Sequence, residues 1–376
     1  MEVISGWKFR IYPNGKQRKE IQTHLWLSKN MWNDLLEYSK NKYRETGKFP
    51  TKMELQSMVK DSGLYSQTAQ AVSHRLYGAL LSFFRMKKDG KEKGFPRFKN
   101  MDRMKSLSYP QSGFKIMERK LNVTPFGEIS IRKHREMKGT IRTLTLKRES
   151  SGKFYAIFTT KTEITPKENR GNQVGMDLGL INFATLSDET MIKNPKHLKK
   201  YGERLAKRQR KLSKKEKGSI RRKKQKRRIA ALYEKVKNAR RDFLHKLSLH
   251  LVNSYSFVAL EELSIQKMTM ERFGKSINDA GWNEFMNMLC YKAEEAGCRV
   301  VFVDPDGTTK ECSSCGEVVD KELKERRHSC PSCGLSMDRD LNASINILKR
   351  ATAGQAGSNA RGVGQRADVE ARSPAL

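Results

Sequence analysis

The stretch from Cys312 to Ala343 carries the motifs that decide the architecture of this chain. It contains Cys312-Ser313-Ser314-Cys315 and Cys330-Pro331-Ser332-Cys333, followed closely by Asp338-Arg339-Asp340-Leu341-Asn342-Ala343. The fourteen residues between the pairs, 316 to 329, form a loop long enough to bring four thiolates around one zinc ion. Each pair precedes a turn-forming glycine (Gly316, Gly334), which favours a zinc ribbon over four ordinary reduced cysteines. Because four cysteines leave no coordination position for a substrate, we expect this zinc to be structural.

Disulfide bonds are a weaker interpretation of these cysteines. Met1 to Arg10 contains Trp7, Lys8 and Arg10 where a secretory signal has its apolar core, so we expect a reducing, cytoplasmic environment. Cys290 and Cys298 lack a partner at ligand spacing and are expected to be small buried hydrophobic residues.

The charge of the chain indicates a polyanionic partner. Its 376 residues, enough for two or three domains, include 76 Lys+Arg against 41 Asp+Glu, a formal net charge of +35. No segment reaches the roughly 18 consecutive apolar residues of a membrane-spanning helix, and the basic runs lack an accompanying apolar face. Nucleic acid is therefore favoured over a membrane surface, with association to the nucleoid if the source is a prokaryote.

The most basic part of the chain runs from Arg204 to Arg228, with fifteen Lys/Arg and one acid, Glu216. The alternative is a helix whose charges are simply solvated. However, the positive charges in this run repel one another unless a polyanion screens them. We expect nucleic-acid contacts from Arg204, Lys207, Arg208, Arg210, Lys211, Arg221, Arg222, Lys223, Lys224, Arg227 and Arg228.

The first part of the chain predicts a barrel interrupted by helices. Val3 to Ile11 reads as a strand, and a helical region follows, in which Thr51-x-x-Glu54 is a capping box and Ser66 is expected to cap a further helix. Beyond Gly94 the pattern alternates, and 140–147 is expected to pair with 153–160 across Ser150-Ser151-Gly152. A strand before the helices and several after them indicate a small split β-barrel with a helical insertion.

The second part of the chain predicts an α/β unit. A hairpin of residues 173–177 and 181–186 is followed by the basic run and an amphipathic helix stripe. The expected order then continues with a strand at 256–260, a helix at 283–296, a strand at 299–303, the ribbon and a helix at 341–349. The tail after Ala351 has the composition of a disordered segment.

Three acids stand at the ends of these expected elements. Asp177 ends one apolar strand, Glu261 ends another, and Asp340 opens the helix after the ribbon. If the strands are neighbours and the helix packs across them, the carboxylates converge, and their mutual repulsion needs cations. Oxygen ligands suit Mg²⁺ or Mn²⁺, and two such ions could support hydrolysis of a phosphodiester. The alternative for any one acid is a helix cap or a strand-end charge.

These motifs resemble those of the TnpB family, transposon-encoded RNA-guided nucleases related to compact type V CRISPR effectors. The resemblance rests on Gly175-Met176-Asp177-Leu178-Gly179, Leu260-Glu261-Glu262-Leu263, the two cysteine pairs and the Asp338 to Ala343 run, which look like three RuvC motifs and a zinc ribbon. It also includes the Tyr12-Pro13 turn and Gly94-Phe95-Pro96-Arg97-Phe98-Lys99, so it extends over most of the chain.

The resemblance implies a multidomain α+β fold. A β-barrel wedge domain (1–12 and 94–165) would hold a helical recognition insertion (13–93), followed by an RNase H-like RuvC domain (172–307 and 336–350), the zinc ribbon (308–335) and the tail (351–376). It implies a guide RNA from the transposon end that pairs with double-stranded and single-stranded target DNA beside a short adjacent motif. Asp177, Glu261 and Asp340 would hold catalytic Mg²⁺ or Mn²⁺. The adjacent acids Glu262 and Asp338 are less favoured candidates for metal ligands.

Three other functions stay open on the sequence. A CRISPR effector with the same chemistry would share the motifs, and a repeat array beside the gene would identify it. A regulator that binds DNA without cutting is disfavoured by the intact acid trio. A DNA-strand transferase is disfavoured because no nucleophilic tyrosine with a His-hydrophobe-His arrangement is evident.

Overall fold

The computed structural model describes residues 1–60, 62–90, 94–264, 268, 274–322, 324–353 and 361–362. It divides into two compact units, Met1–Glu163 and Ile164–Leu376. Most of the predicted tail lies outside the described residues, although α9 (Arg339–Ala353) includes its first three positions. No helix in these described ranges is long and apolar enough to cross a membrane.

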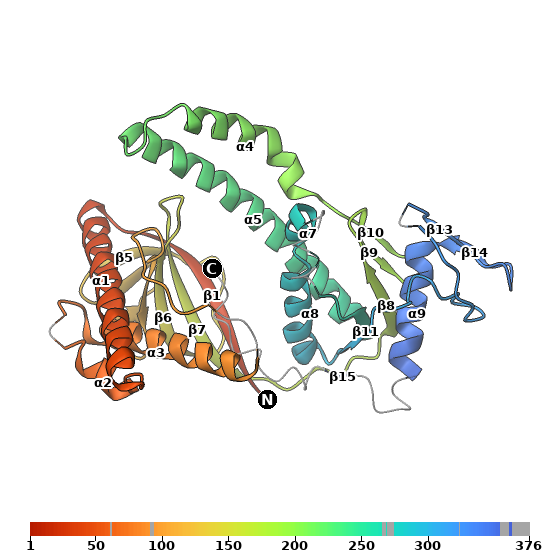
Figure 1. Cartoon of the computed structure of the whole chain (residues 1–376), viewed down its shortest axis with the longest axis horizontal. Helices are drawn as coiled ribbons and strands as arrows, with labels where there is room; N and C mark the ends of the chain where they lie inside the picture. Colours follow the sequence, from red (N-terminus) through yellow and green to blue (C-terminus); the bar gives the residue numbers. More distant parts are fainter. Residues whose placement is uncertain are drawn as a thin grey trace. The chain divides into compact units, whose positions relative to one another are not determined.

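The first unit is built on a barrel-like antiparallel sheet of seven strands (Figure 1). Its strand order is β2-β6-β7-β1-β5-β4-β3. The predicted N-terminal strand is β1 (Glu2–Tyr12), and it pairs with β7 (Phe154–Glu163) and β5 (Gly127–Arg132). The predicted hairpin is confirmed as β6 (Thr140–Arg148) and β7. The remaining strands are β2 (Ser106–Tyr109), β3 (Phe114–Ile116) and β4 (Lys120–Val123).

Three helices lie between β1 and β2: α1 (Gly15–Thr46), α2 (Lys52–Ser57) and α3 (Ser66–Lys88). The capping box of α2 is confirmed, because Thr51 accepts from the Glu54 backbone and Glu54 accepts from the Thr51 backbone. The expectation for Ser66 is wrong: Tyr65 is the N-cap residue of α3, and no side chain caps this helix.

The helices and the sheet of the first unit share one hydrophobic core. Phe9 and Ile11 of β1 belong to the same buried cluster as Leu25 and Trp32 of α1 and Leu76 of α3. The helical stripes seen in the sequence therefore bury apolar surface against the sheet, which is the main stabilising contribution available to an amphipathic helix.

The second unit is built on a mixed six-stranded sheet with the order β10-β9-β8-β11-β12-β15. The strands β8 (Asn172–Leu178), β11 (Tyr255–Glu261) and β12 (Arg299–Val303) are parallel, and the sheet confirms both the hairpin and the two later strands of the prediction. The antiparallel members are β9 (Asn182–Leu186), β10 (Met191–Lys193) and β15 (Arg361–Gly362).

Helices cover both faces of this sheet. Val258 and Leu260 of β11 pack in one buried cluster with Leu251 of α5 (Ile220–Ser254) and Phe285 of α8 (Trp282–Ala296). On the opposite face Phe257, Ala259 and Val301 pack against Ile347 of α9. Both sides of β11 are thus apolar, as expected for a buried parallel strand. A short helix, α7 (Gly274–Ala280), precedes α8.

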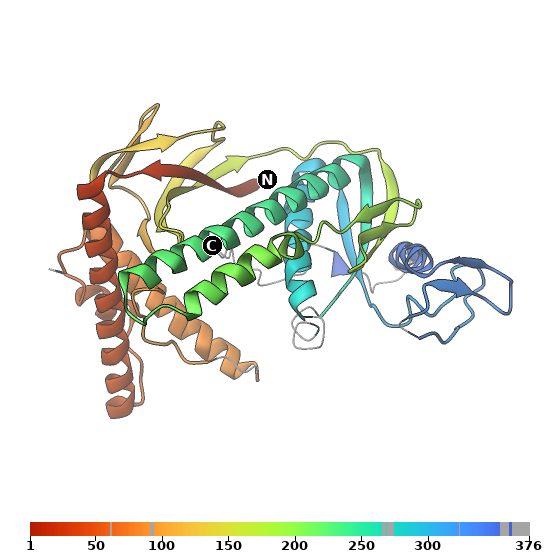
Figure 2. The ribbon, with the colours of Figure 1, turned by 90° about the horizontal axis from the view of Figure 1, so that it is seen from above.

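The predicted basic run forms an antiparallel helix pair, α4 (His197–Ser213) and α5, which lie side by side in both views (Figure 2). Leu205, Ile229 and Leu232 form a small core between the two helices. Gln225 is buried in the same seam and donates to the backbone oxygen of Arg208.

Candidate active site and metal centre

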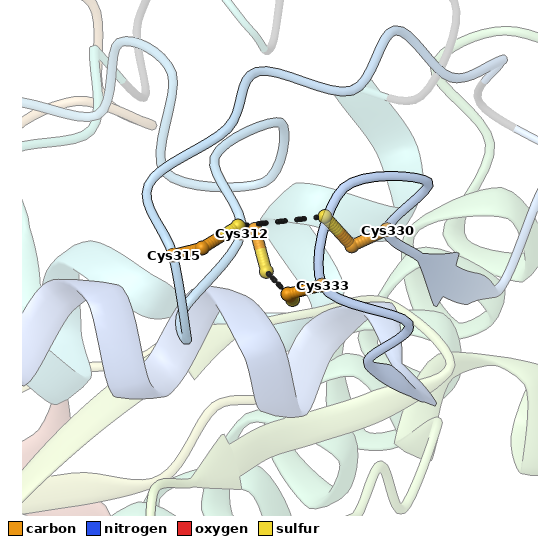
Figure 3. Close-up of side chains that lie close together, drawn as sticks. All are labelled: Cys312, Cys315, Cys330 and Cys333. Carbon is orange, nitrogen blue, oxygen red and sulfur yellow. Dashed lines mark hydrogen bonds between the residues drawn. The ribbon is translucent and has the colours of Figure 1, made fainter.

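The four cysteines come together as the sequence predicts (Figure 3). Their sulfur atoms all lie within 4.8 Å of one another, with 3.6 Å between Cys312 and Cys333 and 3.5 Å between Cys315 and Cys330. Tetrahedral ligands at the usual Zn–S distance of about 2.3 Å are about 3.8 Å apart, whereas disulfide sulfurs are about 2.05 Å apart. The spacing fits a four-thiolate zinc site and excludes disulfides.

The two cysteine pairs have the same backbone geometry. Gly316 and Gly334 each donate a backbone hydrogen bond to the carbonyl of the first cysteine in their pair, at 2.9 and 3.0 Å. Both glycines have positive φ, 83° and 75°, a conformation that other residues adopt at a cost. The turn-forming glycines noted in the sequence therefore close two equivalent knuckles around the sulfur cluster.

The pKa values of two of the clustered thiols differ from that of an ordinary cysteine. Burial opposes ionisation of Cys312, but hydrogen bonds from the Cys315 and Ser314 backbone lower its pKa to about 6. At Cys315 a backbone hydrogen bond from Glu317 is outweighed by burial and by the neighbouring thiols, which raise the pKa to about 12. Four thiolates at these distances therefore need a bound cation to ionise together.

The cysteine segment is fastened to the start of α9 by buried amide side chains. Asn342 accepts from the Ser313 backbone at 2.8 Å and donates to the Glu311 carbonyl at 2.7 Å. Asn346 donates to the carbonyls of Glu311 and Thr308. Both asparagines are buried, so losing these partners would leave polar groups unsatisfied. The cysteine cluster thus fixes the helix that carries Asp340.

The helix cap of α9 is Asp338. Its Oδ1 accepts from the backbone N–H of Asp340 at 2.9 Å and of Leu341 at 3.2 Å. This arrangement satisfies the first turn of the helix without the carboxylate of Asp340. The capping alternative considered for Asp340 is therefore removed, and the two acids of the Asp338-Arg339-Asp340 run have separate roles.

Asp177 and Glu261 lie at the ends of neighbouring parallel strands: Glu261 is the last residue of β11, whereas Asp177 is the last but one of β8, which continues to Leu178. Met176 of β8 pairs with Leu260 of β11, so the next residue of each strand, Asp177 and Glu261, stands at the same edge of the sheet. Gly175 allows α9 to cross β8 closely, because a Cβ atom there would contact the Ser344 carbonyl and lie 2.8 Å from the Leu348 nitrogen. A Cβ atom on Gly179, just after β8, would lie 3.9 Å from Asp340 Oδ2. We call Asp177, Glu261 and Asp340 the carboxylate edge.

The carboxylate edge concentrates negative charge in a partly buried place. Burial, followed by the charges of Glu261 and Asp340, raises the pKa of Asp177 well above its usual value. Burial also raises the pKa of Glu261, against a hydrogen bond from Thr308 and the charge of Arg350. Asp177 is therefore the middle member, since it is affected by both other carboxylates.

Three residues at this edge were missed by sequence reasoning. The buried hydroxyl of Thr308 donates to Glu261 Oε1, and it follows β12 in a loop with no motif that marks it. Arg339 and Arg326 lie 3.4 Å and 3.7 Å from Asp340 Oδ1. Arg339 stands inside the quoted motif and could have been noticed as a neighbour of the acids. Glu262, in contrast, is exposed beside β11.

The donor set of the carboxylate edge fits a hard divalent cation. Buried carboxylates that repel one another are stabilised by Mg²⁺ or Mn²⁺, and the described groups whose charges act on Asp177 include no thiol or imidazole that would favour a softer ion. Among the residues that the structure describes, only the four cysteines gather three or more candidate ligand atoms tightly enough for a single ion.

A cavity of about 1120 Å³ is bounded by the two arginines that lie near Asp340, although Asp340 itself does not line it. Its lining includes Arg326 and Arg339 together with Lys199 of α4 and Lys275 of α7. The lining also includes the acids Glu203 and Asp279, but its cations outnumber them, which favours an anionic ligand.

The predicted nucleic-acid contacts lie on the outside of the α4 and α5 pair. Of the eleven residues, nine are exposed, and only Arg208 and Arg222 are half-buried. Arg222 donates to the carbonyls of Leu212 and Lys215 at 2.8 and 2.6 Å, which closes the turn between the helices. The Arg222 side chain therefore has a structural role, whereas the nine exposed side chains face solvent.

Family models match three parts of the chain. The model described as a probable transposase of the OrfB_IS605 type matches residues 156–272, and the Cas12f1-like TNB domain matches residues 282–347. A model described as a helix-turn-helix domain matches residues 1–48, where the structure has strand β1 and the single helix α1 in place of two helices. These matches define the class: compact proteins of the OrfB and Cas12f1-like type.

Two relatives match nearly the whole chain. A protein of Streptomyces pristinaespiralis, named as a candidate RNA-guided DNA endonuclease, is 31% identical over 94% of this chain and 91% of its own length. A protein of Escherichia coli K12 with the same description, InsQ, is 29% identical over 93% of this chain and 92% of its own length. The chain belongs to the TnpB family.

The fold is also similar to a solved structure, the mini-RNA-guided endonuclease CRISPR-Cas_phi3. The TM-score is 0.51 at 10% sequence identity, with 93% of this chain and 92% of that chain covered. At this identity the likeness concerns the fold alone.

Proposed function

We propose that this protein is an RNA-guided DNA endonuclease. A guide RNA derived from the transposon end would pair with target DNA beside a short adjacent motif, and the protein would hydrolyse phosphodiesters in both strands. The observation that carries this proposal is the convergence of Asp177, Glu261 and Asp340 at one sheet edge, in a chain whose relatives are named for that activity.

The proposed domain roles follow the two units. In the first, residues 1–12 and 94–165 would form the wedge domain around a recognition insertion at 13–93. In the second, residues 172–307 and 336–350 would form an RNase H-like RuvC domain, interrupted by a zinc ribbon at 308–335. The meeting of the ribbon and α9 through Asn342 and Asn346 supports a scaffolding role for this zinc.

In the proposed mechanism, Asp177, Glu261 and Asp340 would hold the catalytic Mg²⁺ or Mn²⁺. When bound, Mg²⁺ or Mn²⁺ supplies an activated water and offsets charge at the leaving 3′-oxygen. Thr308 holds one oxygen of Glu261, which fixes the direction of its carboxylate. Arg326 and Arg339 balance Asp340 and attract the phosphate backbone to the adjacent cavity.

The exposed basic residues of α4 and α5 are proposed to hold guide RNA or the RNA–DNA duplex through its backbone. Phosphate contacts of this kind position a nucleic acid without reading its sequence, which base pairing would supply. A protein acting on DNA in this way is expected at the nucleoid of a prokaryotic cytoplasm.

The test is cleavage by the protein purified with its copurifying RNA. Sequencing that RNA defines the guide, and a matched duplex is then supplied with Mg²⁺, beside a mismatched duplex. We expect free 5′-phosphate ends on matched DNA only. Cleavage of both duplexes, or of neither, would contradict the proposal.

Strand transfer is a second candidate, because the model matching residues 156–272 is described as a probable transposase. A divalent-metal carboxylate site can in principle direct a 3′-hydroxyl instead of water onto a phosphodiester. The same cleavage assay separates the two functions: joined DNA products would favour strand transfer, and free ends favour hydrolysis.

A further inference from the structure

The Gly94 to Lys99 motif forms a structure that the proposed active site does not use. Its chain is clamped against α1 by three hydrogen bonds. Trp32 Nε1 donates to the Arg97 carbonyl at 3.2 Å, and Asn33 both donates to the Lys99 carbonyl at 3.0 Å and accepts from its N–H at 2.8 Å. Both backbone groups of Lys99 are thus fixed by one side chain.

The clamp holds the Lys99 side chain against an aromatic ring. Its Nζ lies 3.2 Å from the ring centroid of Trp32, which is almost completely buried. A cation over an indole face is attracted by the ring, but this attraction replaces only part of the water that a lysine loses. The remaining cost lowers the pKa of Lys99, and a bound anion would offset it.

A second cation, Arg75 of α3, lies near enough for its charge to act on Lys99. Arg75 donates to Ser108 Oγ of β2 at 3.1 Å, and among the described residues neither Arg75 nor Lys99 forms an ion pair with an acid. Burial, and then the charge of Arg75, lowers the pKa of Lys99 to about 7, and burial lowers the pKa of Arg75. Two cations that repel each other in a desolvated site are stabilised by an anion.

We propose that Arg75, Lys99 and the Ser108 hydroxyl form a binding site for one backbone phosphate of a nucleic acid. Arg75 and Lys99 supply charged N–H donors, and Ser108, which already accepts from Arg75, keeps its own O–H to donate. The site belongs to the first unit and the basic helices α4 and α5 to the second, and the role of the site is to position the nucleic acid. The proposed phosphate site rests on the proposed function in one respect, which is that the phosphate belongs to guide RNA or to target DNA.

The first test uses the wild-type chain. A lysine with a pKa near 7 is acylated at neutral pH faster than ordinary lysines, and peptide mass spectrometry reports each position. We expect Lys99 to label early in the free protein and to be protected by nucleic acid. Protection by RNA alone assigns a guide phosphate, and protection only when matched DNA joins the RNA-loaded protein assigns a DNA phosphate. Equal labelling in all three states overturns the site.

The second test uses the salt dependence of binding. Lys99→Met keeps the apolar stem over Trp32 and should reduce the slope of log Kd against log salt by about 0.7 for single-stranded RNA or about 0.9 for duplex DNA. Lys99→Arg should restore it, and Lys60→Met, which removes an exposed lysine of the same unit, should leave it nearly unchanged. An unchanged slope in Lys99→Met overturns the proposal.

Cleavage of matched DNA is measured in the same preparations. If wild-type protein cuts but Lys99 is never protected, the phosphate site is wrong and the endonuclease proposal stands. If RNA protects Lys99 but no cutting occurs, the phosphate site stands and the endonuclease proposal fails.

Discussion

The cysteine cluster draws its four thiols from one stretch of chain, 312 to 333, whereas the carboxylate edge draws Asp177, Glu261 and Asp340 from two strands and a helix. Both concentrate groups that ionise together only beside a cation. The cysteines are positioned by two local knuckles, and the carboxylates by strand register and by the crossing of α9 over β8. A site made by local geometry tolerates changes elsewhere, while one made by tertiary packing depends on every contact that aligns it.

The two sites are also connected. Asn342 and Asn346 join the loop before and within the first cysteine knuckle to α9, so one carboxylate depends on the thiol cluster for its position. Substitutions at each site distinguish the contribution of the cysteine cluster from that of the carboxylate edge.

Asp177→Asn should have the largest effect. Loss of this carboxylate should reduce cleavage by about 10³-fold or more while guide binding persists, because several kcal/mol of metal-dependent stabilisation would disappear. The same change should raise the unfolding midpoint of the metal-free protein, because it removes repulsion with Glu261 and Asp340. Glu262→Gln, at the exposed neighbour, is the control and should change neither quantity. If both variants lose activity alike, the assignment is wrong.

Cys330→Ser tests whether the cysteine cluster supports the carboxylate edge. We expect loss of bound zinc, measured by elemental analysis, and a reduction in cleavage of about 10- to 100-fold, in line with disruption of a metal's supporting shell. Guide binding should fall much less. Cys290→Ser, outside the cluster, should retain zinc. Equal losses of cleavage and guide binding would mean that the cysteine cluster supports the whole fold.

Gly175→Ala tests the crossing of α9 over β8. The added methyl meets the α9 backbone, so we expect a destabilisation of about 1–3 kcal/mol and a drop in cleavage as Asp340 is displaced. Gly202→Ala in α4 is the matched control, because its Cβ would meet open space, and it should stabilise the helix by about 0.5–1 kcal/mol. Full activity in Gly175→Ala would show that the crossing does not position the acid.

Thr308→Val tests the alignment of Glu261. Without the hydroxyl, one carboxylate oxygen loses its donor, and we expect a fall in cleavage of about tenfold, corresponding to roughly 1–2 kcal/mol. Thr308→Ser should restore activity because it keeps the O–H group. Activity lost equally in both variants would indicate a packing role for the methyl group.

The combined change of Arg221, Lys223 and Lys224 to Ala should have the smallest effect on chemistry. Cleavage at saturating nucleic acid should change little, while the salt slope of binding should fall by about 0.9 per lost duplex phosphate contact. Arg222 is left in place because it closes the α4–α5 turn. An unchanged slope would show that these exposed cations are only solvated.

Features fixed by local geometry could be predicted from the sequence, whereas features fixed by tertiary packing could not. The cysteine knuckles could be predicted because spacing and glycines decide them locally. The strands ending at Asp177 and Glu261 were evident as apolar runs, but their register was not. Sequence patterns predicted neither Thr308 as a partner of Glu261 nor Asp338 as the cap that frees Asp340, since both depend on contacts made only in the folded chain. The Ser66 cap was mispredicted because a favourable cap residue can equally be the first residue of a helix.

The central claim is that the carboxylate edge binds divalent metal, and Mn²⁺ titration followed by electron paramagnetic resonance measures it directly. The wild-type protein should remove free Mn²⁺ from solution, and Asp177→Asn should abolish that binding while the zinc content stays unchanged. Equal Mn²⁺ binding by the two proteins would contradict the account.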